Sequence, residues 1–195
     1  IESVAVCFLF SYINPANEDV VVSELEKLGI HVSASSRILP EYREYERLST
    51  TVVNAYVSPV MSKYLTSMED GLETKNIRIM QSNGGSISTG AAKDMAVNCI
   101  LSGPAGGVAG ASVIAKLAGI KKIISFDMGG TSTDVSLCNG DVRLTTQTII
   151  NEIPIKVPVV DMVTVGAGGG SIAYIDPGGA LRVGPQSAGA DPGPV

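Results

Sequence analysis

The sequence has 195 residues, a formal net charge of −5 and 45% hydrophobic residues, so the chain can bury a sizeable core as one large domain or two smaller lobes. The acidic balance and the absence of a lysine or arginine cluster argue against nucleic-acid binding, and no apolar run approaches the ~18 residues of a membrane span. Residues 1–12 lack the basic segment and cleavage site of a signal peptide, so we expect a cytoplasmic protein.

The first part of the chain has the pattern of a strand, a helix and a second strand. Residues 4–10 form a continuous apolar run, which is typical of a strand covered on both faces. Asn14 and Pro15 are typical helix-starting residues. The helix is predicted to bury four aliphatic side chains, those of Val21, Val22, Leu25 and Leu28. Residues 31–39 are predicted as the next strand, which gives a parallel βαβ unit.

A long helical pattern begins near Glu41. Apolar side chains recur at every fourth position and form a stripe that comprises Leu48, Val52, Tyr56, Val60, Tyr64, Met68 and Leu72. We expect this stripe to be the buried face, and Pro59 to kink or divide the helix. We interpret the helix as a connection between lobes: residues 1–75 would contain the end of a first α/β lobe, and residues 76–195 the start of a second.

The second region is predicted to contain a strand at residues 77–81, a helix at residues 91–101 and another helix that starts near Pro104. Three glycines in the last helix, Gly106, Gly107 and Gly110, each lower its intrinsic stability by about 1 kcal/mol relative to alanine. Either close packing against a sheet or contact with a nucleotide would offset that cost.

Residues 121–137 carry the pattern most informative about function. A strand pattern ends at Asp127, a Gly129-Gly130 pair follows, and Asp134 comes after three hydroxyl residues, Thr131, Ser132 and Thr133. Glycines let backbone amides approach an anion, hydroxyls add donors, and carboxylates hold a hydrated metal. The pattern therefore suits phosphate and Mg²⁺. The alternative is a hairpin whose glycine and hydroxyl residues only satisfy turn geometry.

The remainder of the chain is predicted to be rich in strands. Asn139-Gly140 is a two-residue hairpin signal between strands predicted at residues 135–137 and 142–146. A second glycine run then contains Gly168, Gly169 and Gly170. Such a run can wrap an anion with backbone amides, but without a following helix it is not a dinucleotide-binding fingerprint.

The cysteine and histidine residues do not form a pattern typical of a metal site or a catalytic site. The three cysteines, Cys7, Cys99 and Cys138, have no metal-type spacing, and we expect them to be buried, reduced thiols. His31 is the only histidine, and we expect it to be structural or to face solvent.

Residues 127–135 resemble the second phosphate-binding hairpin of the actin, heat-shock chaperone and sugar-kinase superfamily of ATPases. Within it, the chain resembles the hydantoinase A, 5-oxoprolinase and acetone carboxylase family. Four further segments carry this resemblance in the family's order: residues 78–85, 101–108, 165–171 and 183–194. The resemblance implies an α/β fold made of partial, ribonuclease H-like lobes of an actin-like ATPase, joined by the long helix. The chain does not begin with Met and ends where the family normally continues, so we interpret it as an internal fragment.

The resemblance also implies an activity, namely ATP-dependent hydrolysis of a small cyclic amide whose carbonyl oxygen is first phosphorylated. On this basis Asp127 would hold Mg²⁺ through water and Asp134 would orient metal or water. Nucleotide-binding residues would be Gly129, Gly130, Thr131, Ser132, Thr133, Gly168, Gly169 and Gly170. A beta-type, hydantoinase B-like subunit or domain would be the partner. The family's first phosphate hairpin and adenosine-contacting segment are not in this chain, so we expect it alone to be inactive and to bind Mg-ATP weakly.

Two differences from the family pattern leave the substrate open. Many relatives have histidine where this chain has Asn17 and Val163, so two candidate metal ligands or proton carriers are lost. One alternative function is an ATP-dependent ketone carboxylase subunit. Another, which the missing histidines favour, is a non-catalytic, actin-like nucleotide-binding scaffold.

Overall fold

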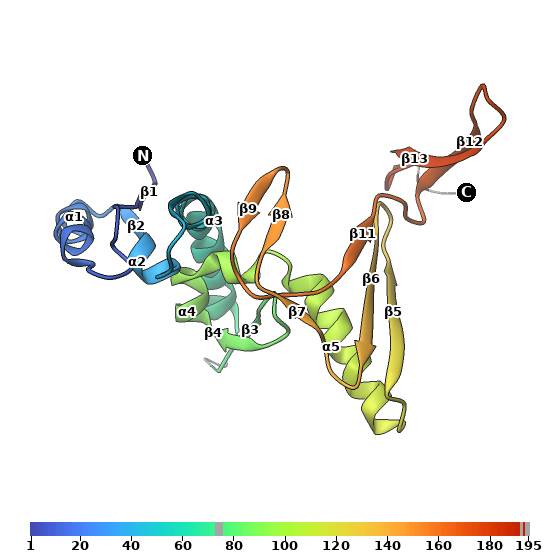
Figure 1. Cartoon of the computed structure of the whole chain (residues 1–195), viewed down its shortest axis with the longest axis horizontal. Helices are drawn as coiled ribbons and strands as arrows, with labels where there is room; N and C mark the ends of the chain where they lie inside the picture. Colours follow the sequence, from blue (N-terminus) through green and yellow to red (C-terminus); the bar gives the residue numbers. More distant parts are fainter. Residues whose placement is uncertain (73–75, 192, 194–195) are drawn as a thin grey trace. The chain divides into compact units, whose positions relative to one another are not determined.

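The computed structural model describes residues 1–72, 76–191 and 193, and the chain forms two compact units (Figure 1). Unit 1 comprises Ile1–Ala105 and Leu144–Val159, and unit 2 comprises Gly106–Arg143 and Val160–Val195. The units divide within helix α5 (Ser102–Leu117) and not near residue 76; the assignment of residues 1–75 and 76–195 to two lobes of a complete protein stays a prediction. Across the described residues, each helix is too short or too polar to cross a membrane.

Unit 1 begins with the predicted βαβ unit. Strands β1 (Ser3–Val6) and β2 (His31–Ala34) are parallel neighbours, and α1 (Ala16–Lys27) connects them. Both strands are shorter than predicted, because residues 9–13 form turns and the chain enters a short helix, α2 (Ser35–Ile38), directly after β2. On α1, Val22 is buried as predicted, whereas Leu28, the residue that follows the helix, is 73% exposed.

Two fully buried charged side chains explain why β1 ends early. The Glu18 carboxylate accepts hydrogen bonds from the Phe8 amide (2.8 Å), the Ser35 hydroxyl (2.7 Å) and the Ser36 amide (2.9 Å). Arg47 donates to the Phe8 carbonyl oxygen (2.7 Å). Both backbone polar groups of Phe8 are thus bound by side chains, and neither is available to extend the strand. Burial raises the pKa of Glu18, but the hydrogen bonds from Ser35, Ser36 and Phe8 outweigh it and leave this pKa below the usual value.

Helix α3 (Glu44–Gly71) runs without interruption through Pro59, so the proline does not divide it. The predicted apolar stripe is wrong as a buried face, since Tyr56 is 80% and Val60 71% exposed. The buried side chains are mainly polar, namely Arg47, Thr50, Thr51, Asn54, Ala55, Ser58 and Leu65.

Asn54 shows why polar residues on α3 are buried. Its amide nitrogen donates to the Ser33 hydroxyl and to the Asp94 carbonyl, both at 2.9 Å, and its side-chain oxygen accepts from the Val97 amide at 3.0 Å. One side chain therefore joins α3 to three other segments of unit 1, and both polar atoms of the Asn54 amide are hydrogen-bonded, as burial requires.

The rest of unit 1 consists of short elements: β3 (Arg78–Met80), β4 (Ser86–Ser88), α4 (Thr89–Asp94), η1 (Ala96–Cys99), β7 (Leu144–Thr145), β8 (Thr148–Ile150) and β9 (Ile153–Ile155). The pairs β3–β4 and β8–β9 are antiparallel. The helix predicted at residues 91–101 is divided into α4 and η1, with Met95 between them.

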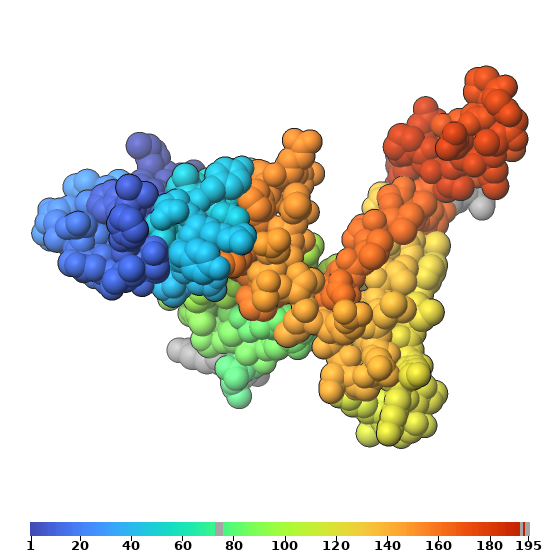
Figure 2. Space-filling view, viewed as in Figure 1, coloured from blue at the N-terminus to red at the C-terminus, as the bar shows by residue number. Residues whose placement is uncertain are grey.

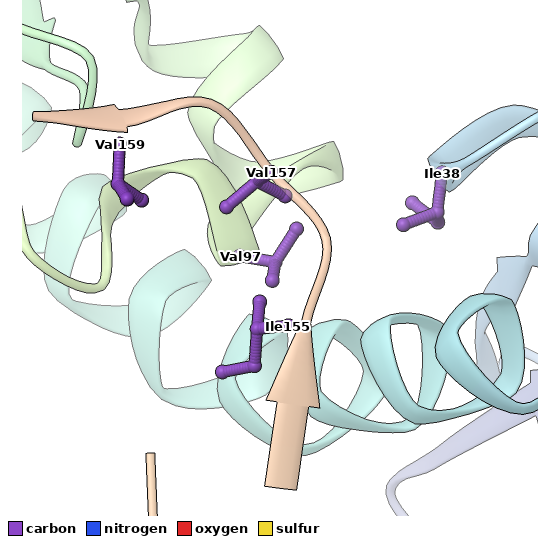
Figure 3. Close-up of a cluster of buried hydrophobic side chains, with 5 residues drawn as sticks. All are labelled: Ile38, Val97, Ile155, Val157 and Val159. Carbon is purple, nitrogen blue, oxygen red and sulfur yellow. The ribbon is translucent and has the colours of Figure 1, made fainter. Parts of the chain in front are cut away.

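Two clusters of buried apolar side chains form the core of unit 1. The larger one joins Ile38, Val97, Ile155, Val157 and Val159, and Figure 3 shows Val97 between Val157 and Ile155. The smaller one contains Leu65, Ala92 and Cys99. Residues 144–159 follow the first segment of unit 2 in the sequence but belong to unit 1. Figure 2 shows this segment against the start of α3, where Ser49 donates to the Pro154 carbonyl.

Unit 2 contains most of α5 and an antiparallel sheet with the order β11-β6-β5. The sheet consists of β5 (Lys122–Met128), β6 (Thr133–Asn139) and β11 (Val163–Val165). Unit 2 also contains a hairpin of β12 (Ser171–Ile175) and β13 (Leu181–Ser187). Strand β10 (Val159–Val160) spans the boundary between the two units. The hairpin predicted at Asn139-Gly140 is wrong: only an isolated bridge joins Asn139 to Asp141, and the next partner of β6 is β11. The α/β class predicted from the sequence is confirmed.

Candidate functional site

The hairpin β5–β6 carries the candidate site at its tip. Seven consecutive residue pairs join the strands, from Lys122 opposite Asn139 to Met128 opposite Thr133. Residues 129–132 form the turn, hereafter the hairpin turn, and the Gly129 amide donates to the Ser132 carbonyl at 2.9 Å. The Gly-Gly pair and the hydroxyl residues therefore lie where the sequence pattern predicted them.

Three oxygen-bearing side chains form a row across the sheet beside this turn. Asp127 on β5 lies opposite Asp134 on β6, and Asp134 lies opposite Thr164 on β11. Directly paired residues point to the same face with Cβ atoms ~5 Å apart. The Thr164 hydroxyl donates to the Asp134 carboxylate at 2.5 Å. Two adjacent carboxylates repel each other unless a cation lies between them, so the row is suited to a hydrated divalent cation.

Sequence reasoning missed Thr164. The signal was the alternation of Val163, Thr164 and Val165 immediately before the glycine run, which predicts a strand with one polar face. Only the register of β11 against β6 shows that this hydroxyl meets Asp134.

Helix α5 contacts the same row of side chains. A Cβ added to Gly107 would lie 3.4 Å from the Asp127 carboxylate oxygen, whereas one added to Gly110 would meet nothing within 4 Å. The two explanations for the glycines of this helix were close packing and contact with a nucleotide, and close packing therefore does not account for Gly110. At Gly107, the absent side chain leaves the approach to Asp127 open.

Backbone amides at the turn provide possible anion donors. Among the described residues, the amides of Gly130 and Thr131 have no hydrogen-bond partner. Thr133 differs from its neighbours, because it is 4% exposed and its hydroxyl donates to the Ala167 carbonyl at 2.6 Å. Gly130 and Thr131 are thus the donors best placed for a ligand.

The second glycine run lies against the hairpin turn. Residues 166–170, hereafter the glycine loop, connect β11 to β12. The Gly169 amide donates to the Gly129 carbonyl at 2.9 Å, and the Gly170 amide donates to the Gly130 carbonyl at 2.8 Å. The structure therefore brings together the two glycine segments that the sequence analysis identified separately.

The donor set suits a metal held in part by water or by a ligand's own oxygens. No group of three or more His, Cys, Asp or Glu side chains that could hold a metal occurs in residues 1–72, 76–191 and 193. Asp127 and Asp134 provide two carboxylates, and Mg²⁺ usually keeps several waters and takes oxygens from substrate phosphates. The residues present thus fit a water-mediated Mg²⁺ site.

No cysteine or histidine side chain belongs to this row. Cys99 and Cys138 are buried, Cys7 is partly buried, and all three are free thiols. Burial raises the pKa of the Cys99 thiol, which disfavours the nucleophilic thiolate. His31 is half-buried in β2, and its Nε2 has no partner among the described residues.

Comparisons with known proteins identify three informative relatives. The chain is 44% identical over its whole length to a 5-oxoprolinase of Saccharomyces cerevisiae, of which it covers 15%. All of it matches 29% of the chain in a crystal structure of an ATP-dependent caprolactamase from Pseudomonas jessenii, with a TM-score of 0.85 and 38% identity. It is also 36% identical to the acetone carboxylase beta subunit of Xanthobacter autotrophicus, where 96% of this chain matches 28% of the relative.

These matches fix the family and limit what the chain represents. Every match above spans less than a third of the relative's own length. A family model described as hydantoinase/oxoprolinase matches residues 47–195, in agreement with the resemblance found in the sequence. The chain therefore belongs to the hydantoinase/oxoprolinase family.

Proposed function

We propose that this chain supplies the phosphate-binding hairpin of an ATP-dependent cyclic amidase. The observation that carries the proposal is the pairing of Asp127 with Asp134 beside a Gly-Gly turn, in which the amides of Gly130 and Thr131 have no partner among the residues that the structure describes. The family supports the reaction class, since a 5-oxoprolinase and an ATP-dependent caprolactamase are among the relatives.

The proposed reaction explains why a lactam hydrolase would need ATP. An unstrained amide carbonyl is a poor electrophile, and phosphorylation of its oxygen would give an imidate phosphate to which water can add. The ring C–N bond would then break to give an amine and an acyl phosphate, and a second water would hydrolyse the acyl phosphate to a carboxylate and phosphate. Phosphoryl transfer requires the protein mainly to position the reactants and to stabilise charge. Bound Mg²⁺ would neutralise charge on the phosphates.

Each site residue then has a defined task. The amides of Gly130 and Thr131, with the hydroxyls of Thr131 and Ser132, would donate to phosphate oxygens. Asp127 would hold the waters of Mg²⁺, and Asp134, oriented by Thr164, would direct a second bound water. Gly107 would keep the approach to Asp127 open.

The partner and the location belong to the same proposal. A relative named as a caprolactamase subunit alpha and one named as an acetone carboxylase beta subunit act within multi-subunit enzymes. We infer that the whole protein works with a beta-type, hydantoinase B-like subunit or domain. A cytoplasmic location would give it access to ATP.

The test is ADP release by the full-length protein with its partner, with and without hydantoins and 5-oxoproline. Lactam-stimulated release should fall about a hundredfold in Asp127→Asn. Asp141→Asn is the matched control, because Asp141 lies at the other end of the hairpin with a side chain that is 90% exposed. Unchanged release in Asp127→Asn would reject the site.

The same assay separates the second candidate function. The match to an acetone carboxylase subunit supports an ATP-dependent ketone carboxylase as the second candidate function. Release that requires bicarbonate and a ketone, and that no lactam stimulates, would replace the amidase with the carboxylase. Release with none of these substrates would remove support for both enzymes.

A further inference from the structure

We propose that the glycine loop is a positioning element that directs the amides of Gly130 and Thr131 toward the phosphate and does not bind it directly. This inference rests on the proposed function, and it gives Gly168, Gly169 and Gly170 a different role from the one that the family resemblance implies.

The first argument is that the amides of Gly168, Gly169 and Gly170 already donate hydrogen bonds within the protein. Gly168 donates to the Ser171 hydroxyl at 2.9 Å, and Gly169 and Gly170 donate to carbonyls of the hairpin turn. A phosphate would have to break these hydrogen bonds to gain new ones, which returns little net free energy.

The second argument concerns the direction of the peptide groups in the turn. The Gly129 carbonyl shares a peptide group with the Gly130 amide, and the Gly130 carbonyl shares one with the Thr131 amide. Both peptides are trans, and a trans peptide points its C=O and N–H in opposite directions. Because the loop binds both carbonyls, it turns both N–H groups away from itself. Without the loop, either peptide could flip and present an oxygen to the anion.

The third argument is steric. A Cβ on Gly168 would lie 2.5 Å from the Gly129 carbonyl oxygen and 2.7 Å from the Thr131 amide nitrogen, and one on Gly170 would lie 2.9 Å from the Gly130 carbonyl oxygen. A Cβ on Gly169 would meet nothing closer than 3.8 Å. Glycine is therefore required at two positions by backbone contact with the turn.

The loop is itself fixed at both ends. Thr133 donates to the Ala167 carbonyl at 2.6 Å. At the other end, the Gly170 carbonyl accepts from the Ala188 amide at 2.7 Å and from the Ser187 hydroxyl at 3.1 Å. A loop anchored in this way can hold the turn in one conformation before a ligand arrives, which reduces the entropic cost of binding.

The test compares Gly168→Ala with Gly166→Ala in the full-length enzyme, because a Cβ on Gly166 would meet nothing within 4 Å. Amide hydrogen exchange of the nucleotide-free protein, followed in a peptide that covers residues 127–134, should be faster in Gly168→Ala and unchanged in Gly166→Ala. Gly168→Ala should raise KM for ATP by about tenfold or more and leave KM for the lactam unchanged, whereas Gly166→Ala should leave both KM values within about twofold of wild type. A loss of stability alone would not raise only one KM.

A second pair of variants covers failure of Gly168→Ala to fold. Thr133→Val removes the hydrogen bond to Ala167, and Thr133→Ser restores it. Thr133→Val should accelerate exchange at the turn and raise KM for ATP, and Thr133→Ser should reverse both effects.

The outcomes separate this inference from the proposed function. Unchanged exchange at residues 127–134 in both Gly168→Ala and Thr133→Val, or an equal effect of Gly166→Ala, would overturn the positioning role. If the wild-type enzyme releases no ADP with any substrate, the proposed function fails, and the hydrogen-exchange comparison still decides whether the loop holds the turn.

Discussion

The two units differ in which side chains they bury and which they expose. In unit 1, α3 buries Asn54, whose amide is fully hydrogen-bonded, and Arg47, which donates to two carbonyl oxygens, and apolar clusters contain Val97 and Leu65. In unit 2, one face of the sheet carries exposed apolar side chains, those of Ile124, Phe126, Met128, Leu137, Val163 and Val165. The other face carries the buried side chains of Ser136 and Cys138 along β6 and, beside the turn, Asp127, Asp134 and Thr164. Unit 1 thus has the features of a scaffold, whereas unit 2 carries polar side chains beside the hairpin turn that do not serve packing.

The largest expected effect comes from breaking the buried charges of unit 1. Arg47→Met removes the buried donor to the carbonyl oxygens of Phe8 and Glu41. We expect a loss of about 3–5 kcal/mol in the free energy of unfolding, because two hydrogen bonds from a charged group are lost, measured by urea denaturation. Arg37→Met is the control, because its ion pairs with Asp19 and Glu26 are exposed and should contribute about 1 kcal/mol or less. Equal losses would show that the Phe8 contact is unimportant.

A slightly smaller effect tests which face of α3 is buried. Leu65 is 0% exposed and Leu48 is 44% exposed on the same helix. Leu65→Ala should therefore cost about 3 kcal/mol through lost burial and a residual cavity, and Leu48→Ala about 0.5 kcal/mol. Thermal unfolding of both variants measures the difference. A large cost for Leu48→Ala would mean that another part of the whole protein covers the stripe.

A moderate, pH-dependent effect is expected at Glu18. Its pKa is lower in the folded chain than the ordinary value of 4.5, so the unfolded state binds more protons in the interval between the two values. The stabilisation is present above pH 4.5 and is lost as the pH falls through the folded pKa. Glu18→Gln should cost about 2 kcal/mol near neutral pH. This difference from wild type should shrink in acid, and a pH-independent difference would contradict the assignment.

The smallest effect should come from the exposed sheet face of unit 2. Phe126 is 65% exposed, so Phe126→Ser should change the free energy of unfolding by about 0.5 kcal/mol or less, as judged from the urea midpoint. Ile155→Ala in the core of unit 1 provides the contrast, at about 3 kcal/mol. A comparable loss for Phe126→Ser would show that this face is covered in the whole protein.

The sequence predicted those features of the fold that depend on local residue patterns. The βαβ unit followed from an apolar run and the Asn14-Pro15 helix start, and the β5–β6 hairpin followed from its glycine pair. The end of β1 did not, because it depends on Glu18 and Arg47 binding Phe8 across the fold. The stripe on α3 did not predict the buried face, because periodicity separates two faces of a helix but does not show which face the neighbouring elements cover.

The candidate site was predictable to a similar degree. Asp127, Gly129, Gly130, Thr131 and Asp134 were identified from spacing and chemistry. No local pattern indicated that Thr164 pairs with Asp134, or that Gly168 contacts the turn, because both depend on strand register and backbone contact between segments far apart in sequence.

The central claim is that the β5–β6 hairpin binds the phosphates of a Mg²⁺-bound nucleotide. The most direct measurement is calorimetric titration of ATP into the full-length protein, with and without Mg²⁺, for wild type, Asp127→Asn and Asp141→Asn. We predict Mg²⁺-dependent binding that is weakened about tenfold or more in Asp127→Asn and is unchanged in Asp141→Asn. Binding that is equally tight in all three proteins would contradict the claim.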